Sequence, residues 1–230
     1  MKMKTKILSL IAIVSFIGLF TACDSMEDIN NTFVGDGEFV YIGKADSIKT
    51  KPGRNRLELS WLLLSDPRVA SYKVLWNNKA DSIQGMLTKT EGVDTVRIMF
   101  DNMNEAVHQF DIFLYDKLGN ASIRSSINGR VYGLKYEASL LNRTFEREIR
   151  DGDNLIMEWV EAGEDVAAVE VEYLDNSNKM VRKQIPGKTI IDTLQNFPLG
   201  GSLMYRTKYL PEPLAIDAFY SDYQNISFDI

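Results

Sequence analysis

The sequence predicts an all-β protein made of two tandem β-sandwiches. Beyond Gly37, short runs of residues alternate between apolar and polar, which is the pattern of half-buried strands. Turn residues separate these runs roughly every 10 residues, as in sandwich folds. The whole pattern then occurs a second time, and each copy carries a tryptophan at the corresponding place, Trp61 and Trp159.

The first 22 residues predict an export signal peptide. Lys2, Lys4 and Lys6 make a basic start, residues 7–20 carry no charge, and small residues follow. The apolar run is about 14 residues long, whereas a membrane-spanning helix needs roughly 20. We therefore expect residues 1–22 to be removed on export.

Cys23 is the predicted site of a lipid anchor. Residues 20–23 resemble a bacterial lipobox, in which a diacylglycerol is joined to the cysteine sulfur. The alternative is a soluble secreted protein with an incidental cysteine. Cys23 is the only cysteine, so a disulfide within the chain is excluded and the fold must rest on its apolar cores.

Residues 23–37 are polar and acidic and predict a flexible tether. Acidic residues just after the lipidated cysteine resemble the surface-export signal of Bacteroidetes lipoproteins. The resemblance implies a place on the outer face of the outer membrane, with the lipid as the contact to the bilayer.

The charge of the chain argues against two classes of partner. The formal net charge is −6, and loss of the three leader lysines takes it to about −9. Nucleic-acid binding requires clustered Lys and Arg, and this acidic chain has no basic stripe of that kind. Attraction of the protein surface to an anionic bilayer is disfavoured for the same reason.

Residues 38–132 are expected to form the first sandwich. Alternating segments at 56–61, 71–74, 95–98 and 109–112 predict its strands. Turn-forming residues flank these segments at 51–55, 65–67 and 116–120.

Residues 133–230 are expected to form the second sandwich. Its predicted strands are at 154–159, 169–173, 188–192 and 204–209, with a short helical turn within 137–143. Each tryptophan lies where a fibronectin type III or immunoglobulin-like domain has its core tryptophan. No cysteine pair flanks it, which favours the fibronectin type III-like variant.

Catalytic and metal chemistry find little support in the sequence. His108 is the only histidine and is interpreted as a strand residue, since a nucleophile and an orienting partner are not evident. Residues 151–154 could offer oxygens to calcium but are better explained as a hairpin turn. Glu170 and Glu172 lie two apart on one strand, so they are expected to face solvent together. We therefore predict no enzyme activity, cofactor or metal.

Three aromatic residues are candidates for ligand binding. Trp76 ends a predicted strand beside two asparagines, and Tyr209 and Tyr220 lie near the loop at 210–213. Loops at one end of a sandwich commonly carry binding sites, and an aromatic ring can stack on a sugar. The alternative is ordinary structural packing.

A short pattern occurs five times: Asp, then Ser or Thr, then an aliphatic residue or Met. It resembles the O-glycosylation motif of exported Bacteroidetes proteins, although strand starts also favour such sequences. We predict Ser25, Ser47 and Ser82 as the acceptors.

The chain as a whole resembles a family of Bacteroidetes lipoproteins that carries a domain of unknown function. The resemblance rests on residues 23–28, 41–47, 140–144, 205–213 and 217–220. It implies a non-catalytic surface protein that assists carbohydrate utilisation, binding a glycan or a protein partner of glycan-capture machinery. The alternative function is a structural or adhesive spacer, or an assembly protein of the cell envelope.

Overall fold

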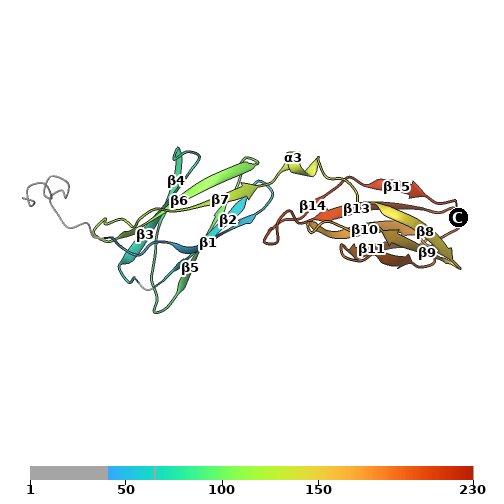
Figure 1. The fold of residues 1–230 in the computed structure, drawn as a ribbon, viewed down its shortest axis with the longest axis horizontal. Helices are drawn as coiled ribbons and strands as arrows, with labels where there is room; N and C mark the ends of the chain where they lie inside the picture. Colours follow the sequence, from blue (N-terminus) through green and yellow to red (C-terminus); the bar gives the residue numbers. More distant parts are fainter. Residues whose placement is uncertain (1–40, 65, 230) are drawn as a thin grey trace, which may run out of the picture. The chain divides into compact units, whose positions relative to one another are not determined.

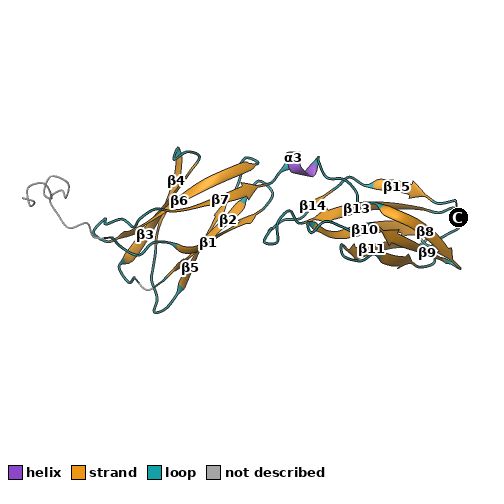
Figure 2. Ribbon diagram, viewed as in Figure 1, coloured by secondary structure: helices purple, strands orange, loops and turns teal. Residues whose placement is uncertain are grey.

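The computed structural model describes residues 41–64 and 66–229, which are built almost entirely of β-strands (Figures 1 and 2). Tyr41–Ile230 form one compact unit. The predicted signal peptide, Cys23, Ser25 and the tether at 23–37 lie outside the described residues.

The first sandwich has two antiparallel sheets. One has the order β1-β2-β5 and the other the order β4-β3-β6-β7. The strands are β1 (Asp46–Pro52), β2 (Leu57–Leu63), β3 (Val69–Trp76), β4 (Asp81–Met86), β5 (Asp94–Phe100), β6 (Ala106–Asp116) and β7 (Ser125–Val131).

The second sandwich repeats this order. A three-stranded sheet has the order β12-β9-β8, and β11, β10 and β13 follow one another in the larger sheet. The final strand of the repeat is split in two, because β14 and β15 both pair with β13. The strands are β8 (Phe145–Asp151), β9 (Asn154–Trp159), β10 (Val166–Leu174), β11 (Met180–Pro186), β12 (Ile191–Leu194), β13 (Ser202–Tyr209), β14 (Phe219–Tyr220) and β15 (Gln224–Ser227).

The architecture confirms the predicted fold class of tandem, fibronectin type III-like sandwiches. Counted within each copy, the second strand lies at the centre of the small sheet (β2 and β9). The third and sixth strands pair at the centre of the large sheet (β3 with β6, and β10 with β13). Inward-facing apolar residues of both sheets then meet between them, as this architecture requires.

Each sandwich is packed around its tryptophan, as predicted. Trp61 and Trp159 are each 1% exposed. The ring of Trp61 meets Tyr72 edge-on, with centroids 5.4 Å apart, and Trp159 lies against Phe145 and Tyr205. Two separate apolar clusters result, one for each sandwich.

Residues 151–154 form the predicted hairpin turn, with β8 ending at Asp151 and β9 beginning at Asn154. Gly152 has φ +56°, a conformation that glycine adopts without steric cost. The turn therefore has a sufficient structural reason for its glycine and its polar residues.

The short helical turn lies earlier than predicted, at α3 (Leu134–Glu137) rather than within 137–143. Its start is fixed by Glu105, whose two carboxylate oxygens accept the backbone N–H groups of Lys135 and Tyr136 at 2.8 and 2.7 Å. A partner about 30 positions away in the chain is invisible to local sequence patterns, which explains the shift.

Contacts between the two sandwiches involve two arginines that follow β1. Both terminal nitrogens of Arg54 bind the carboxylate of Glu137, and Arg56 binds Asp217 at 2.8 and 2.6 Å. A Cβ on Gly53 would lie only 2.5 Å from a carboxylate oxygen of Asp217, so a glycine is needed there. We call Arg54, Arg56, Glu137 and Asp217 the interdomain joint.

Candidate functional site

The three predicted ligand-binding aromatics do not come together. Trp76 ends β3 in the first sandwich, whereas Tyr209 and Tyr220 belong to the paired strands β13 and β14 of the second. The register pairs Tyr220 with Lys208 and Tyr209 with Phe219. Since residues directly opposite share a face of the sheet, Tyr209 and Tyr220 face opposite sides.

Tyr209 is half-buried on the second sandwich and is held by a hydrogen bond. Its hydroxyl donates a hydrogen bond to the backbone oxygen of Leu141 at 2.6 Å. Burial raises the pKa of Tyr209 above its ordinary value. The ring therefore helps to hold the segment that follows α3, which is a structural role.

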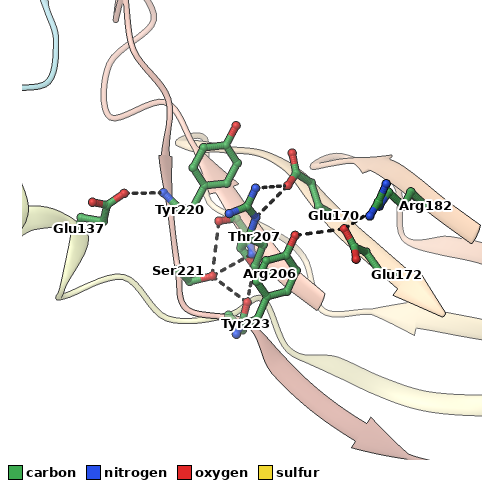
Figure 3. Close-up of polar contacts among 10 residues, drawn as sticks. Glu137, Glu170, Glu172, Arg182, Arg206, Thr207, Tyr220, Ser221 and Tyr223 are labelled. Carbon is green, nitrogen blue, oxygen red and sulfur yellow. Dashed lines mark hydrogen bonds and ion pairs between the residues drawn. The ribbon is translucent and has the colours of Figure 1, made fainter. Parts of the chain in front are cut away.

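Tyr220 belongs to a stacked cluster around Arg206, shown in Figure 3. The guanidinium carbon of Arg206 lies 4.0 Å from the ring centre of Tyr220 and 4.7 Å from that of Tyr223. Its Nε donates to Glu170 at 2.8 Å. Burial alone would lower the pKa of Arg206, but the hydrogen bond and the charge of Glu170 raise it.

Glu170 and Glu172 share one face of β10, as predicted, and each is paired across to a neighbouring strand. Glu170 pairs with Arg206 on β13, and Glu172 pairs with Arg182 on β11 at 3.2 Å (Figure 3). The hydroxyl of Tyr223 also donates to Glu172, at 3.4 Å. We call this set the Arg206 face: Glu170, Glu172, Arg182, Arg206, Tyr220 and Tyr223.

A buried polar network supports the Arg206 face from behind. The hydroxyl of Ser221 donates to Asn142 at 2.7 Å and accepts the backbone N–H of Thr207 at 2.8 Å. Thr207 is fully buried, and the network joins β13, the loop between β14 and β15, and the segment after α3. The carboxylates of the Arg206 face are thus each paired with an arginine, and hydrogen bonds tie the strand that carries Arg206 to its neighbours.

Trp76 lines a hollow in the first sandwich with a volume of about 640 Å³. The other walls come from the β3–β4 turn, with Asn78 and Lys79, and from the start of β6, with Asn104 before it and Gln109 within it. Amide side chains therefore make up a large share of the polar lining. We call this feature the Trp76 hollow.

The ring of Trp76 is held in a fixed place. It is half-buried, packs against the first core and meets Phe100 edge-on, with centroids 5.0 Å apart. The half-buried ring therefore keeps a fixed position among the residues that line the hollow.

The Trp76 hollow also contains an ion pair. The side chain of Asp111 is only 8% exposed, and its Oδ1 accepts a hydrogen bond from Ser126 at 2.7 Å. Its Oδ2 lies 3.6 Å from Arg124, whose side chain is 53% exposed. A buried carboxylate therefore lies beside a largely exposed guanidinium.

His108 also lines this hollow, and its Nε2 lies 2.9 Å from the backbone oxygen of Asn104.

Across residues 41–64 and 66–229, no group of three potential metal-binding side chains is found. Within the same described part of the chain, no helix has the length and apolar character to cross a membrane.

Two of the predicted glycosylation acceptors lie in the described residues. Ser47 is exposed, with φ +46°, and its hydroxyl donates to Asp46 at 2.8 Å. Ser82 is exposed on β4, at the edge of the large sheet. Both are accessible to an enzyme, and their modification stays a prediction.

Sequence reasoning did not find Arg206, Arg124 or Asp111 as site residues. Asp111 lies in the predicted strand segment 109–112, and its contacts with Ser126 and Arg124 come from outside that segment. Arg206 gains its partners through the register of β13 with β10 and β14. Local sequence patterns contain no signal for either arrangement.

A family model described as a domain of unknown function, DUF4998, matches residues 23–219. The chain belongs to this family. Membership confirms the predicted domain of unknown function, while the Bacteroidetes origin and the lipoprotein character stay predictions. A comparison with curated proteins finds no match.

Two solved structures are similar to this chain. The chicken CNTN1 FN1–FN3 domains share 13% identity, with 83% of this chain and 68% of that one covered and a TM-score of 0.44. A segment of two fibronectin type III domains from chicken tenascin shares 8% identity, with coverages of 81% and 99% and a TM-score of 0.31.

Proposed function

We propose that this DUF4998 protein is a non-catalytic lipoprotein, anchored through Cys23 at the outer membrane, that binds a glycan in the Trp76 hollow. In this role it is an accessory of glycan-capture machinery on the cell surface. The observation that supports the proposal is the hollow itself, with its fixed aromatic ring and amide-rich lining.

The dimensions and chemistry of the hollow suit a sugar. Ligand sites in proteins commonly have volumes of roughly 300–1,000 Å³, and about 640 Å³ lies within that range. The side-chain amides of Asn78, Asn104 and Gln109 can each donate and accept hydrogen bonds, which matches the hydroxyl groups of a sugar ring. Trp76 supplies an apolar surface for the C–H face of the ring.

The interdomain joint favours a second function, that of a spacer. Two Arg–carboxylate pairs, each with two hydrogen bonds, connect the sandwiches. Such paired bonds add geometric specificity as well as energy. A spacer uses this stiffness to hold a partner away from the membrane, and it needs no ligand.

A glycan screen separates the two functions. The full chain, purified in detergent, would be screened against dietary and host glycans. We expect hits that weaken about tenfold, or roughly 1.4 kcal/mol, in Trp76→Ala and in the exposed variant Asn78→Ala. Tyr223→Ala, which removes an aromatic ring from the Arg206 face, is the matched control and should leave binding unchanged.

Two results would reject glycan binding at the hollow. One is the absence of any glycan hit, which leaves the spacer function. The other is full binding by both Trp76→Ala and Asn78→Ala, whatever the Tyr223→Ala control shows.

The anchor is tested separately. Metabolic labelling with a radioactive fatty acid should label the wild-type chain and not Cys23→Ala. Protease added to intact cells should digest the labelled protein if it lies on the outer face. Equal labelling of both proteins would contradict lipidation at Cys23.

A further inference from the structure

The Trp76 hollow holds more positive than negative charge, in a chain whose formal net charge is −6. Lys79 and Arg124 line it, against the single carboxylate of Asp111. A local reversal of sign in an acidic protein concentrates anions at that place.

Lys79 is placed at the hollow by an unusual turn. Asn77, Asn78 and Lys79 have φ values of +50°, +53° and +69°, three consecutive residues in the left-handed region. Asparagine adopts that region readily, but lysine does so at a cost. The turn is held by the side chain of Asn77, which donates to Asp81 at 3.1 Å, and by a backbone bond from Ala80 to Asn77 at 3.0 Å.

The ammonium group of Lys79 has no ion pair among residues 41–64 and 66–229. Asp81, the acid that follows in the turn, accepts a hydrogen bond from Asn77 instead. A strained backbone therefore presents a cation that no contact within the described chain requires.

Asp111 engages Arg124 only through a long contact. Its closest contact with Asp111 is 3.6 Å, beyond good hydrogen-bond distance, and the other oxygen of Asp111 is taken by Ser126. Guanidinium offers five N–H donors in a planar fork that fits a carboxylate or a sulfate. Asp111 therefore holds Arg124 in the hollow while leaving donors for a ligand.

We infer that the Trp76 hollow binds an acidic sugar, whose carboxylate or sulfate group is held by Lys79 and Arg124. The remaining hydroxyl groups of the sugar face the amides of Asn78, Asn104 and Gln109. The inference rests on the proposed glycan binding and adds the class of glycan. A neutral glycan leaves Lys79 without an ion pair and Arg124 with only its long contact to Asp111, so it binds more weakly.

Calorimetric titration of the full chain in detergent tests this class. The probes are oligogalacturonate, which carries only carboxylates, sulfated dextran oligosaccharides, which carry only sulfates, and neutral dextran oligosaccharides. We expect an acidic probe to bind at least about tenfold more tightly than the neutral one. The preference should shrink as salt rises from 50 to about 500 mM, because exposed charges are screened. The tighter of the two acidic probes identifies the acidic group.

Lys79→Gln and Arg124→Gln should each weaken the acidic probe about tenfold or more and leave the neutral probe nearly unchanged. Arg182→Gln is the matched control, since Arg182 is an exposed arginine of the Arg206 face in the other sandwich. It removes the same charge and should change neither titration.

The failures of the two proposals are distinguishable. If neutral and acidic probes bind equally, and both still depend on Trp76, the acidic class is overturned and glycan binding stands. If an acidic probe binds Lys79→Gln and Arg124→Gln as tightly as the wild type, the two cations are not its site. If no probe and no glycan of the screen binds, both proposals fall.

Discussion

The two sandwiches share a strand order but differ in the polar surfaces that their larger sheets carry. On the second, the Arg206 face pairs Glu170 with Arg206 and stacks that arginine on two tyrosine rings. On the first, the Trp76 hollow leaves Lys79 without an ion pair in the described chain and Arg124 with a long one. The charged groups of the Arg206 face are paired with one another, whereas the Trp76 hollow has hydrogen-bond donors without a close partner in the described chain.

This difference teaches that a repeated fold need not repeat a function. The cores are alike, with a tryptophan 1% exposed in each, because both sheets must bury their apolar faces against each other. The surface side chains, and not the shared fold, determine what each sandwich binds. The Arg206 face, whose charges are paired, stabilises the fold, and the Trp76 hollow keeps hydrogen-bond donors available to a ligand.

The largest expected effect tests the likeness of the cores. Trp61→Ala and Trp159→Ala should each lower the free energy of unfolding of their own sandwich by about 3–5 kcal/mol, through lost burial and an unfilled cavity. Urea unfolding followed by near-ultraviolet circular dichroism measures both. A loss below about 1 kcal/mol in one sandwich would show that the two cores are not equivalent.

The next effect tests the difference between the outer surfaces. Arg206→Ala should lower the free energy of unfolding by about 1–2 kcal/mol, since it removes the pair with Glu170 and two stacking contacts. This range allows for screening of a side chain that is 29% exposed. Lys79→Gln should change stability by less than about 0.5 kcal/mol. Equal losses would remove the contrast between a self-paired and an unpaired surface.

A smaller effect concerns strain at the hollow. Lys79→Gly should raise the stability of the first sandwich by up to about 1 kcal/mol, because glycine adopts φ +69° without steric cost. The same variant should lose the acidic sugar along with the ammonium group. Asn178→Gly, at φ +58° in the second sandwich, is the control and should gain less, since asparagine tolerates this region. A loss of stability in Lys79→Gly would show that the turn is not strained.

The smallest effect concerns acid and the interdomain joint. Hydrogen bonds from Arg54 and Arg56 lower the pKa values of Glu137 and Asp217. Carboxyls with a lowered folded pKa contribute stability above their ordinary pKa of about 4 and lose it as pH falls through the folded value. Stability should therefore decline below about pH 4, by roughly 0.5 kcal/mol for each such partly exposed pair. Glu137→Gln should show a shallower decline between pH 5 and pH 2; an identical curve would mean that the pair contributes nothing.

Much of the fold could be predicted because strand alternation is local. The segments that lead to Trp61 and Trp159 alternate with the period of a strand. They form β2 and β9, respectively, and each tryptophan is buried. The position of α3 could not be predicted, since Glu105 sets it from a distant part of the chain.

The candidate site was predicted only in part, for a related reason. Trp76 was chosen for its place at a strand end, and it does line a hollow. Tyr209 could not be recognised as a structural residue, because its partner is the backbone oxygen of Leu141, 68 positions earlier. Arg124 and Asp111 meet only after β6 pairs with β7. Register decides such contacts, and no local pattern encodes it.

Hydrogen–deuterium exchange of the full chain, with and without saturating acidic oligosaccharide, tests the contrast between the sandwiches most directly. We predict slower exchange at residues 75–80 and 104–111 around the Trp76 hollow, and unchanged exchange at residues 204–209 and 219–224 around the Arg206 face. Protection centred on the Arg206 face, with none at the hollow, would contradict the account.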